Sequence, residues 1–262
     1  MTTITTDPTP ASTAKHPQTA FTTSRGRTAS SAFTQGAAQG VVNEAREGAV
    51  IGTLQADLSD LSAVEAMASE ILDAAYSLDV LINNAGVYRT PTPVTDAGLD
   101  SRFVVNTVAP YLLTRRLLPA LAPGARVLNL SSAAQAPVDL DALGGSVRIA
   151  DMDAYAQSKL AITMWSRHLA DELGDSGPVV LAINPGSLLA TNMVREGFGY
   201  SGNDINIGVD ILVRAATSDD FADVTGRYFD DDICSSGDPH EDALDAAKNA
   251  AVVEQIEALL TR

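Results

Sequence analysis

The sequence predicts an α/β domain in which a doubly wound parallel sheet lies between two layers of helices. Short runs rich in Val, Ile and Leu end in small polar residues, which is typical of strands buried on both faces of a sheet. Helical stretches separate these runs by short links, and such alternation favours a parallel sheet with right-handed crossovers. The length of 262 residues suits one such three-layer α/β/α domain with a full core.

The expected elements follow this alternation along the chain. A weak helix at 39–46 precedes a strand at 49–54, which delivers Asp57 at its end. Four runs are then expected as strands and are separated by longer helices. The order is helix 62–77, strand 78–83, helices around 96–122, strand 126–130, an irregular stretch, helix 152–173, strand 179–183, helix 206–218, a short strand near 226–229 and a final helix from about 242.

Residues 1–34 differ in composition from the rest of the chain. Thr, Ser, Ala and Pro dominate them and Asp7 is their single acid, so the composition favours disorder or a solvated arm over a central strand. A targeting peptide is the alternative, because the arm is nearly free of acids and carries Lys15, Arg25 and Arg27. We therefore expect an atypical arm at 1–34 and one domain at 35–262, with an atypical or incomplete first β-α-β unit.

Tyr155 and Lys159 stand four residues apart at the start of the expected helix 152–173. Residues at this spacing share one helix face, so the ammonium group can favour ionisation of the phenol and make it usable as an acid or base. Lowering a phenol pKa by two to three units takes roughly 3 to 4 kcal/mol, which one cation in a cleft can largely supply. Taken alone, such a pair is far more often a buried tyrosine and a solvated lysine than a proton-transfer site.

The small polar residues beside other apolar runs give this pair its significance. They are Asn83 to Gly86 after the strand 78–83, Asn106 in an apolar stretch, Ser131 and Ser132 after the strand 126–130, and Asn184 to Gly186 after the strand 179–183. Ligands bind just beyond the carboxyl ends of strands in open parallel sheets, so these residues are expected to line one crevice. Each piece alone is an ordinary turn or cap, and only the joint order is diagnostic.

This set resembles the short-chain dehydrogenase/reductase family, from Asp57 to about Tyr228. The resemblance implies a Rossmann-like fold, NAD or NADP as cofactor, and a catalytic set of Asn106, Ser132, Tyr155 and Lys159. In it Tyr155 is the acid/base, Lys159 binds the nicotinamide ribose and lowers the tyrosine pKa, Ser132 (or, less favoured, Ser131) orients the carbonyl, and Asn106 holds a relay water. The implied cofactor-binding residues are Asp57, Asn83, Ala85, Gly86, Lys159, Pro185, Gly186 and Thr191.

One departure from the family pattern concerns the phosphate site. The family begins with a strand followed by Thr-Gly-x-x-x-Gly-x-Gly, whose glycines bring the backbone close to a pyrophosphate. No such motif occurs in residues 1–50, where residues 11–27 hold a single glycine, Gly26. The first unit is either replaced by an unrecognised one or lost in a truncated or rearranged relative. Arg25 and Arg27 are a weaker option, as acceptors of the 2'-phosphate of NADP.

Charge and composition exclude several classes of partner. The net charge of −16 argues against nucleic acid and anionic membranes. No run approaches the roughly twenty apolar residues that span a bilayer, and the single cysteine, Cys234, excludes an internal disulfide. The scattered histidines and the run 230–232 give no metal motif. We expect a cytoplasmic protein with no metal that acts on a small-molecule carbonyl or alcohol.

Two loops are expected to determine specificity, because binding groups tend to lie on loops held by a rigid sheet. The first lies between Ser132 and Tyr155, and its length resembles that of the retinol dehydrogenase-like branch of the family. The second is 191–200, where Met193, Val194, Phe198 and Tyr200 would close over an apolar substrate.

The helices near 107–121 and 152–169 carry more apolar residues than one buried face requires. A homodimer or homotetramer formed through them is expected, with a monomer that buries the surplus beneath its own loops as the alternative. The residues behind this expectation are Tyr111, Leu112, Leu117, Leu118, Met164 and Trp165.

Three functional hypotheses follow from these residues. The first is an NAD(P)-dependent oxidoreductase that interconverts a secondary alcohol and a ketone on a small apolar substrate, favoured by the complete catalytic set. The second is a non-catalytic protein of the same fold that cannot hold a dinucleotide, favoured by the absent glycine motif. The third, a redox-free lyase or dehalogenase on this fold, ranks last because such dehalogenases resemble a Ser-Tyr-Arg triad and this chain has Lys159.

Overall fold

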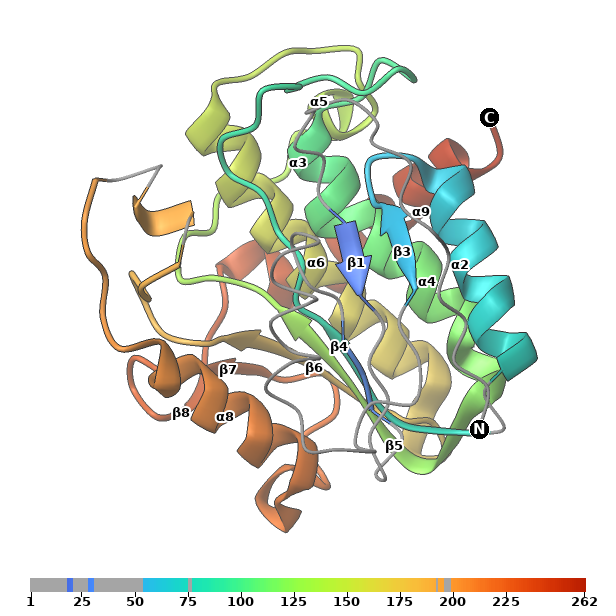
Figure 1. The fold of residues 1–262 in the computed structure, drawn as a ribbon, viewed down its shortest axis with the longest axis vertical. Coiled ribbons are helices and arrows are strands. Elements are labelled where there is room, and N and C mark those ends of the chain that lie inside the picture. The colour runs from blue at the N-terminus through green and yellow to red at the C-terminus, as the bar shows by residue number, and fades with distance from the viewer. Residues whose placement is uncertain (1–17, 21–27, 31–53, 75–76, 192, 196–198) are drawn as a thin grey trace, which may run out of the picture.

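The computed structural model describes residues 18–20, 28–30, 54–74, 77–191, 193–195 and 199–262. Its main sheet has six strands in the order β2-β4-β5-β6-β7-β8, the first five parallel and the last antiparallel (Figure 1). The fold prediction is confirmed. The strands are β2 Thr28–Ser30, β4 Leu78–Asn83, β5 Leu121–Leu130, β6 Val179–Asn184, β7 Tyr228–Asp230 and β8 Ser235–Gly237, and β1 Gln18–Ala20 pairs separately with β3 Gln55–Asp57 in antiparallel register.

Neighbouring residues of the central strands enter two different cores. Val127 of β5 and Val180 of β6 join the larger core, whereas Leu128 and Leu181 join a second one on the other face. Because successive strand residues point to opposite faces, an unbroken apolar strand must be covered twice. The helices α2 Leu61–Ala74, α4 Ala109–Leu117, α6 Asp151–Leu173 and α9 Ala246–Leu260 cover one face, and α8 Ile205–Thr217 covers the other (Figure 1).

The helical stretch from 101 to 120 is continuous but irregular. It runs through α3 Ser101–Phe103, a π-helical segment Val104–Val108, α4 and a 3-10 turn Leu118–Ala120. The Asp100 side chain caps its start by accepting from the Arg102 amide. Such π segments within longer helices often mark functional sites, and this one contains Asn106.

The two short N-terminal strands differ from the expected solvated arm. β2 pairs in parallel with β4 and forms the edge of the main sheet, while β1 pairs with β3. Strand pairing uses backbone N–H and C=O groups, so a polar composition does not prevent it. The expected helix 39–46, most of the expected strand 49–54, and the region around Gly26 lie outside the described residues.

Other short elements of the described residues were not expected from the sequence. They include the four-residue helix α5 Leu140–Leu143, the edge strand β8 and the 3-10 turn Glu241–Leu244. The last lies just before α9, where the sequence predicted the start of one helix. Each is short, and apolar periodicity does not detect elements of three or four residues.

The apolar residues of α4 and α6 are largely buried within the chain itself. Tyr111 and Trp165 are 1% and 0% exposed, and their rings meet edge to face at 5.5 Å. The helix α9 packs along α6, and Glu257 accepts a hydrogen bond from the Tyr111 hydroxyl at 2.5 Å. The surplus that suggested an oligomer is therefore accounted for by α9, and a homo-oligomer stays a prediction.

In the part of the chain that the structure describes, no helix combines the length and apolar character that crossing a bilayer requires. Cys234 is exposed and unpaired.

Candidate active site

Tyr155 and Lys159 lie in the second and third turns of α6, at the carboxyl edge of the sheet. The Lys159 Nζ atom is 5.8 Å from the centre of the Tyr155 ring. Lys159 is 4% exposed and donates from Nζ to the carbonyl oxygen of Leu130 at 2.7 Å, the last residue of β5. The strand end thus fixes the lysine beside the tyrosine, as the spacing of four predicts.

Burial shifts the pKa values of both residues of the pair. Burial raises the pKa of the Tyr155 phenol, and a hydrogen bond with Ser132 opposes that rise. Burial also lowers the pKa of Lys159 to about 8, because a low-dielectric site disfavours the ammonium form. In the protein alone the pKa of Tyr155 is thus raised by burial, and the lowering of that pKa by Lys159 stays a prediction.

Ser131 and Ser132 have separate surroundings. The Ser131 hydroxyl is buried and bonds the Lys159 carbonyl oxygen at 2.9 Å and the Thr163 Oγ1 at 2.7 Å. Ser132 is half-buried, and its side chain hydrogen-bonds the Tyr155 phenol. Of the two serines, Ser132 is the one that faces Tyr155.

Asn106 ties the loop after β4 to α6. Its Oδ1 accepts from the Val87 amide at 2.7 Å, and its Nδ2 donates to the Val87 carbonyl and the Ser158 Oγ, each at 2.9 Å. The side chain is thus used structurally. Its backbone carbonyl has no donor at the spacing of four, because Pro110 has no N–H. The part of Asn106 in holding a relay water stays a prediction.

Gly86, in the loop after β4, lies beside Lys159 and Asn106. A Cβ at this position would lie 3.4 Å from the Lys159 Nζ and 3.5 Å from the Asn106 Oδ1. The absent side chain therefore leaves room beside the buried ammonium. Ala85 beside it is 7% exposed.

Asn83 does not point into this space. Its Nδ2 donates to the Thr114 Oγ1 at 3.0 Å and to the Asn129 Oδ1 at 2.7 Å, and Asn129 in turn donates to the Ser166 Oγ at 2.8 Å. This buried chain of amides joins β4, β5 and the helices of one face. The side chain of Asn83 is structural, and only its backbone adjoins the loop.

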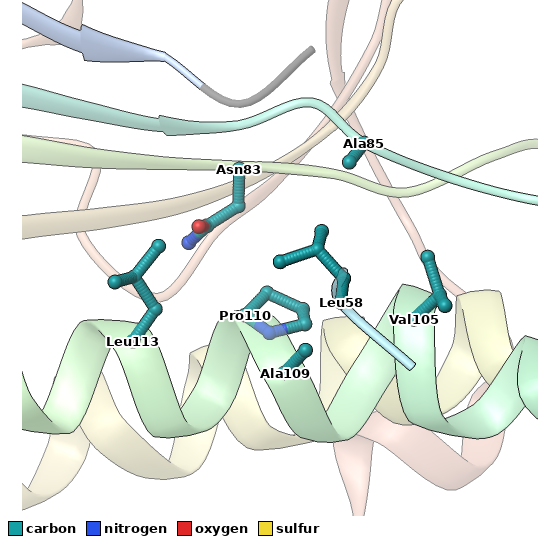
Figure 2. A pocket seen from close by; sticks show the side chains of 7 residues that line it. All are labelled: Leu58, Asn83, Ala85, Val105, Ala109, Pro110 and Leu113. Atoms are coloured by element: carbon teal, nitrogen blue, oxygen red, sulfur yellow. The ribbon is translucent and has the colours of Figure 1, made fainter. Parts of the chain in front are cut away.

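Asp57 lies at the end of β3, where its Oδ1 accepts from the amide and hydroxyl of Ser59 at 2.8 and 2.7 Å. A cavity of about 10 Å³ lies near it, lined by Leu58, Asn83, Ala85, Val105, Ala109, Pro110 and Leu113 (Figure 2). That volume is at the lower limit for one water molecule. Its lining is mostly apolar, as Figure 2 shows.

The segment after β6 carries Pro185, Gly186 and Thr191. Gly186 has φ of +108°, a conformation that favours glycine, and the Thr191 Oγ1 accepts from the Val194 amide at 3.3 Å. Asp232 fixes this segment, since its carboxylate accepts from the Ser187 amide at 2.8 Å and from the Asn184 Nδ2 at 2.9 Å. Asp232, an exposed residue of the acidic run 230–232, thus braces the segment.

Three residues near the pair were not found from the sequence. The Tyr88 ring meets the Tyr155 ring at 5.5 Å, edge to face. The Ser132 carbonyl accepts from the Gln135 Nε2 at 2.9 Å and the Tyr228 hydroxyl at 3.1 Å. An aromatic residue directly after Asn-Asn-Ala-Gly-Val was the available signal for Tyr88. Tyr228 gives none, because 96 residues separate it from Ser132, and Gln135 lies in a stretch that was expected to be irregular.

Comparison with known proteins identifies relatives of this arrangement. Human retinol dehydrogenase 13 is 34% identical over 194 residues, which are 66% of this chain and 58% of the human protein. A solved structure of an uncharacterized protein from Mycobacterium paratuberculosis has a TM-score of 0.62 and 30% identity, over 78% of this chain and 73% of that one. A short chain dehydrogenase from Burkholderia cenocepacia, solved with NADP, has a TM-score of 0.52 and 25% identity, over 68% and 73%.

The chain thus spans less than two thirds of the length of the human retinol dehydrogenase that it matches. The similarity to retinol dehydrogenases confirms the branch that the loop before Tyr155 predicted. The family profile described as short chain dehydrogenase matches residues 20–198. This chain belongs to the short-chain dehydrogenase/reductase family.

Proposed function

We propose that the protein is an oxidoreductase that interconverts a secondary alcohol and a ketone on a small apolar substrate with NAD(P). The observation that carries this proposal is the position of Tyr155, whose phenol is bonded by Ser132 and whose ring lies 5.8 Å from the Lys159 ammonium. A phenol, a hydroxyl and a cation that converge from two elements suit proton transfer to a carbonyl oxygen.

The residues near Tyr155 fit the nicotinamide end of a dinucleotide. Gly86 leaves open the space beside the Lys159 Nζ that a Cβ would enter, and the free donors of that ammonium suit ribose hydroxyls. Pro185, Gly186 and Thr191 would adjoin the carboxamide, with Ala85, the Asn83 backbone and Asp57 toward the adenosine. When bound, the dinucleotide supplies or accepts a hydride.

The other steps belong to this chain's own side chains. Ser132 donates to the substrate oxygen and orients it, and the Tyr155 phenol gives the proton to that oxygen in reduction or removes it in oxidation. Lys159 stabilises the phenolate that reduction leaves, since a cation near an ionising group favours its charged form. A water held by the Asn106 carbonyl then exchanges the proton with Lys159. These proton transfers require Lys159 to be charged. The rate should therefore depend on the protonation of Lys159, whose pKa is about 8.

The substrate class is proposed from the surroundings of Tyr155. Tyr88 presents an aromatic ring beside the phenol, and Met193 and Val194 lie after Thr191 in the segment that follows β6. These groups favour an apolar body behind the carbonyl. The similarity to retinol dehydrogenases supports the same class. We also propose a cytoplasmic protein, from the charge of −16, and a homo-oligomer.

A non-catalytic protein of the same fold is the second candidate, and two observations favour it. The glycine motif for the pyrophosphate is absent from residues 1–50. The cavity beside Leu58 and Ala85, at the end of the sheet expected to hold the adenine, has a volume of only about 10 Å³. Both concern the adenosine half of the dinucleotide, and neither touches the residues around Tyr155.

The two candidates separate in an activity assay. The protein would be incubated with NADPH or NADH and a set of ketones and aldehydes that includes retinaldehyde, and the loss of absorbance at 340 nm followed. Turnover that disappears in Tyr155→Phe and persists in Tyr111→Phe supports the oxidoreductase, because the Tyr111 hydroxyl bonds Glu257 of α9, outside this site. No turnover with either dinucleotide, or turnover unaffected by Tyr155→Phe, contradicts it.

A further inference from the structure

Arg102 forms an ion cluster with Asp100 and Asp151 at the start of α6, the helix that carries Tyr155. The residue is 2% exposed, and its Nε and Nη2 atoms bond the two carboxylate oxygens of Asp100 at 2.9 and 2.6 Å. Its Nη1 bonds the Oδ1 of Asp151 at 2.6 Å. Two-pronged contact to one carboxylate fixes the plane of the guanidinium, which then aims its remaining donor at the second carboxylate.

The same guanidinium joins the two segments that carry the site. Its Nη1 also donates to the Tyr88 carbonyl oxygen at 3.4 Å, in the loop that follows Gly86. Asp151 is the first residue of α6, one helical turn before Tyr155. Arg102 therefore holds the β4 loop and the start of α6 at a fixed separation.

Asn106 makes a second link between the same segments, one helical turn further along. It bonds both backbone groups of Val87 and the Ser158 Oγ, and that hydroxyl donates to the Tyr155 carbonyl at 2.7 Å. Residues four apart share a helix face, so the two links lie side by side. One reaches α6 before Tyr155 and the other after it.

The two segments that Arg102 links each carry one ring of an aromatic pair. Tyr88 and Tyr155 meet edge to face with centroids 5.5 Å apart and planes inclined by 62°. Tyr88 comes from the loop and Tyr155 from α6, so a shift of either segment moves one ring relative to the other. A buried ion pair is weak evidence for a stabilising role, because desolvation offsets the attraction, and such pairs are better attested as devices that fix geometry.

We propose that Arg102 is a positioning residue, which acts through Asp151 and the Tyr88 carbonyl to set the position of the Tyr88 ring against Tyr155. The two rings in contact form one side of the substrate site, so this inference rests on the proposed function. Arg102 does not touch the reacting atoms. Its part is to keep the aromatic ring in contact with the phenol.

Asp151→Ala is the informative variant. The Asp151 side chain is 57% exposed and the Arg102–Asp100 pair remains in this variant, so the fold is retained, whereas Arg102→Gln leaves Asp100 buried without its partner. Arg102→Lys keeps the charge but lacks the planar fork that bonds both Asp100 oxygens while reaching Asp151. Arg115→Gln is the matched control, since Arg115 pairs with Glu172 on a distant part of α6.

The first readout needs neither dinucleotide nor substrate. In protein labelled at tyrosine, the nuclear Overhauser effect between the Tyr88 and Tyr155 rings would be measured, with assignment by single Tyr→Phe variants. The effect should be lost or strongly reduced in Asp151→Ala and Arg102→Lys and unchanged in Arg115→Gln. An unchanged effect in both cluster variants overturns the proposal.

The second readout divides the kinetic parameters. A displaced Tyr88 ring weakens substrate binding. The value of kcat/KM should therefore fall by roughly 10- to 100-fold in Asp151→Ala, mostly through a higher KM. A KM equal to that of the wild type, together with a lowered melting temperature, would reduce Arg102 to a structural role. If the wild-type protein turns over no carbonyl, the proposed function fails and the ring contact alone decides the role of Arg102.

Discussion

Ser131 and Ser132 are adjacent in sequence, and their side chains bond opposite ends of the same helical segment: Ser131 the Lys159 carbonyl at 2.9 Å, and Ser132 the Tyr155 phenol. The strand β5 ends at Leu130, directly before the two serines, and one side chain turns into the core and the next toward the crevice. This arrangement assigns a structural part to Ser131 and a chemical part to Ser132.

The two serines should therefore respond differently to replacement by alanine. Ser132→Ala should lower kcat by roughly 100-fold or more with little change in melting temperature, because a donor to the substrate oxygen is lost. Ser131→Ala should lower the free energy of unfolding by roughly 1 to 3 kcal/mol, because Thr163 and the Lys159 carbonyl lose a buried partner. Carbonyl reduction and chemical denaturation measure the two effects, and the reverse pattern would contradict the assignment.

The buried Lys159 predicts a pH-dependent difference in stability. Its pKa is lowered from 10.5 to about 8 in the folded protein, so between these values the unfolded chain binds more protons and the contribution of Lys159 to stability rises with pH. Below pH 8 the folded protein carries the full cost of the buried charge. The free energy of unfolding of Lys159→Met minus that of the wild type should thus be larger at pH 7 than at pH 10, by roughly 3 kcal/mol.

Urea denaturation of both proteins from pH 6.5 to 10.5 measures this difference. Groups common to the two proteins cancel in the comparison. A difference in unfolding free energy that does not change between pH 7 and 10 would show that Lys159 keeps an ordinary pKa.

The amides of Asn83 and Asn129 should be energetically coupled. They are joined at 2.7 Å in the core, and removing one leaves a buried polar group without a partner. A double-mutant cycle with alanine at both positions should give a coupling of roughly 1 kcal/mol. Asn83 paired with Asn249, which bonds Ala243 elsewhere, is the control cycle and should be additive. Additivity in both cycles would mean that the amide chain contributes nothing specific.

Trp165 tests the packing of α6 against α4 and α9. It is fully buried, and its Nε1 has no hydrogen-bond partner among the described residues. Trp165→Ala should cost about 3 to 5 kcal/mol. Trp165→Phe should cost roughly 1 to 2 kcal/mol, because an aromatic ring remains and no hydrogen bond is lost. Far-ultraviolet circular dichroism in urea measures the free energy of unfolding of both variants. An equal loss in Trp165→Phe and Trp165→Ala would indicate that Nε1 has a hydrogen-bond partner.

The sequence predicted those elements whose side chains carry a long apolar pattern. β4 at 78–83 matches the expected strand, and α6 begins and ends within one residue of its prediction. The convergence of Tyr155, Lys159 and Ser132 followed from the order of strand ends, since parallel strands bring their carboxyl ends to one edge.

What the sequence missed depends on contacts between distant residues. Nothing local distinguishes Asn83 in a buried amide chain from Asn83 beneath a cofactor, because its partner Asn129 is 46 residues away. The link from Arg102 to Asp151 spans 49 residues. The raised pKa of Tyr155 likewise depends on how completely the fold covers the phenol, and the spacing of four to Lys159 contains no information on burial.

Dinucleotide binding tests the central claim most directly. The protein would be titrated with NADPH and with NADH while energy transfer from its single tryptophan, Trp165, and the melting temperature are followed, since a ligand of the folded state must raise the latter by mass action. We predict saturable quenching and a higher melting temperature with at least one dinucleotide. No change in either quantity at millimolar NADPH and NADH would contradict the account and favour a non-catalytic member of the family.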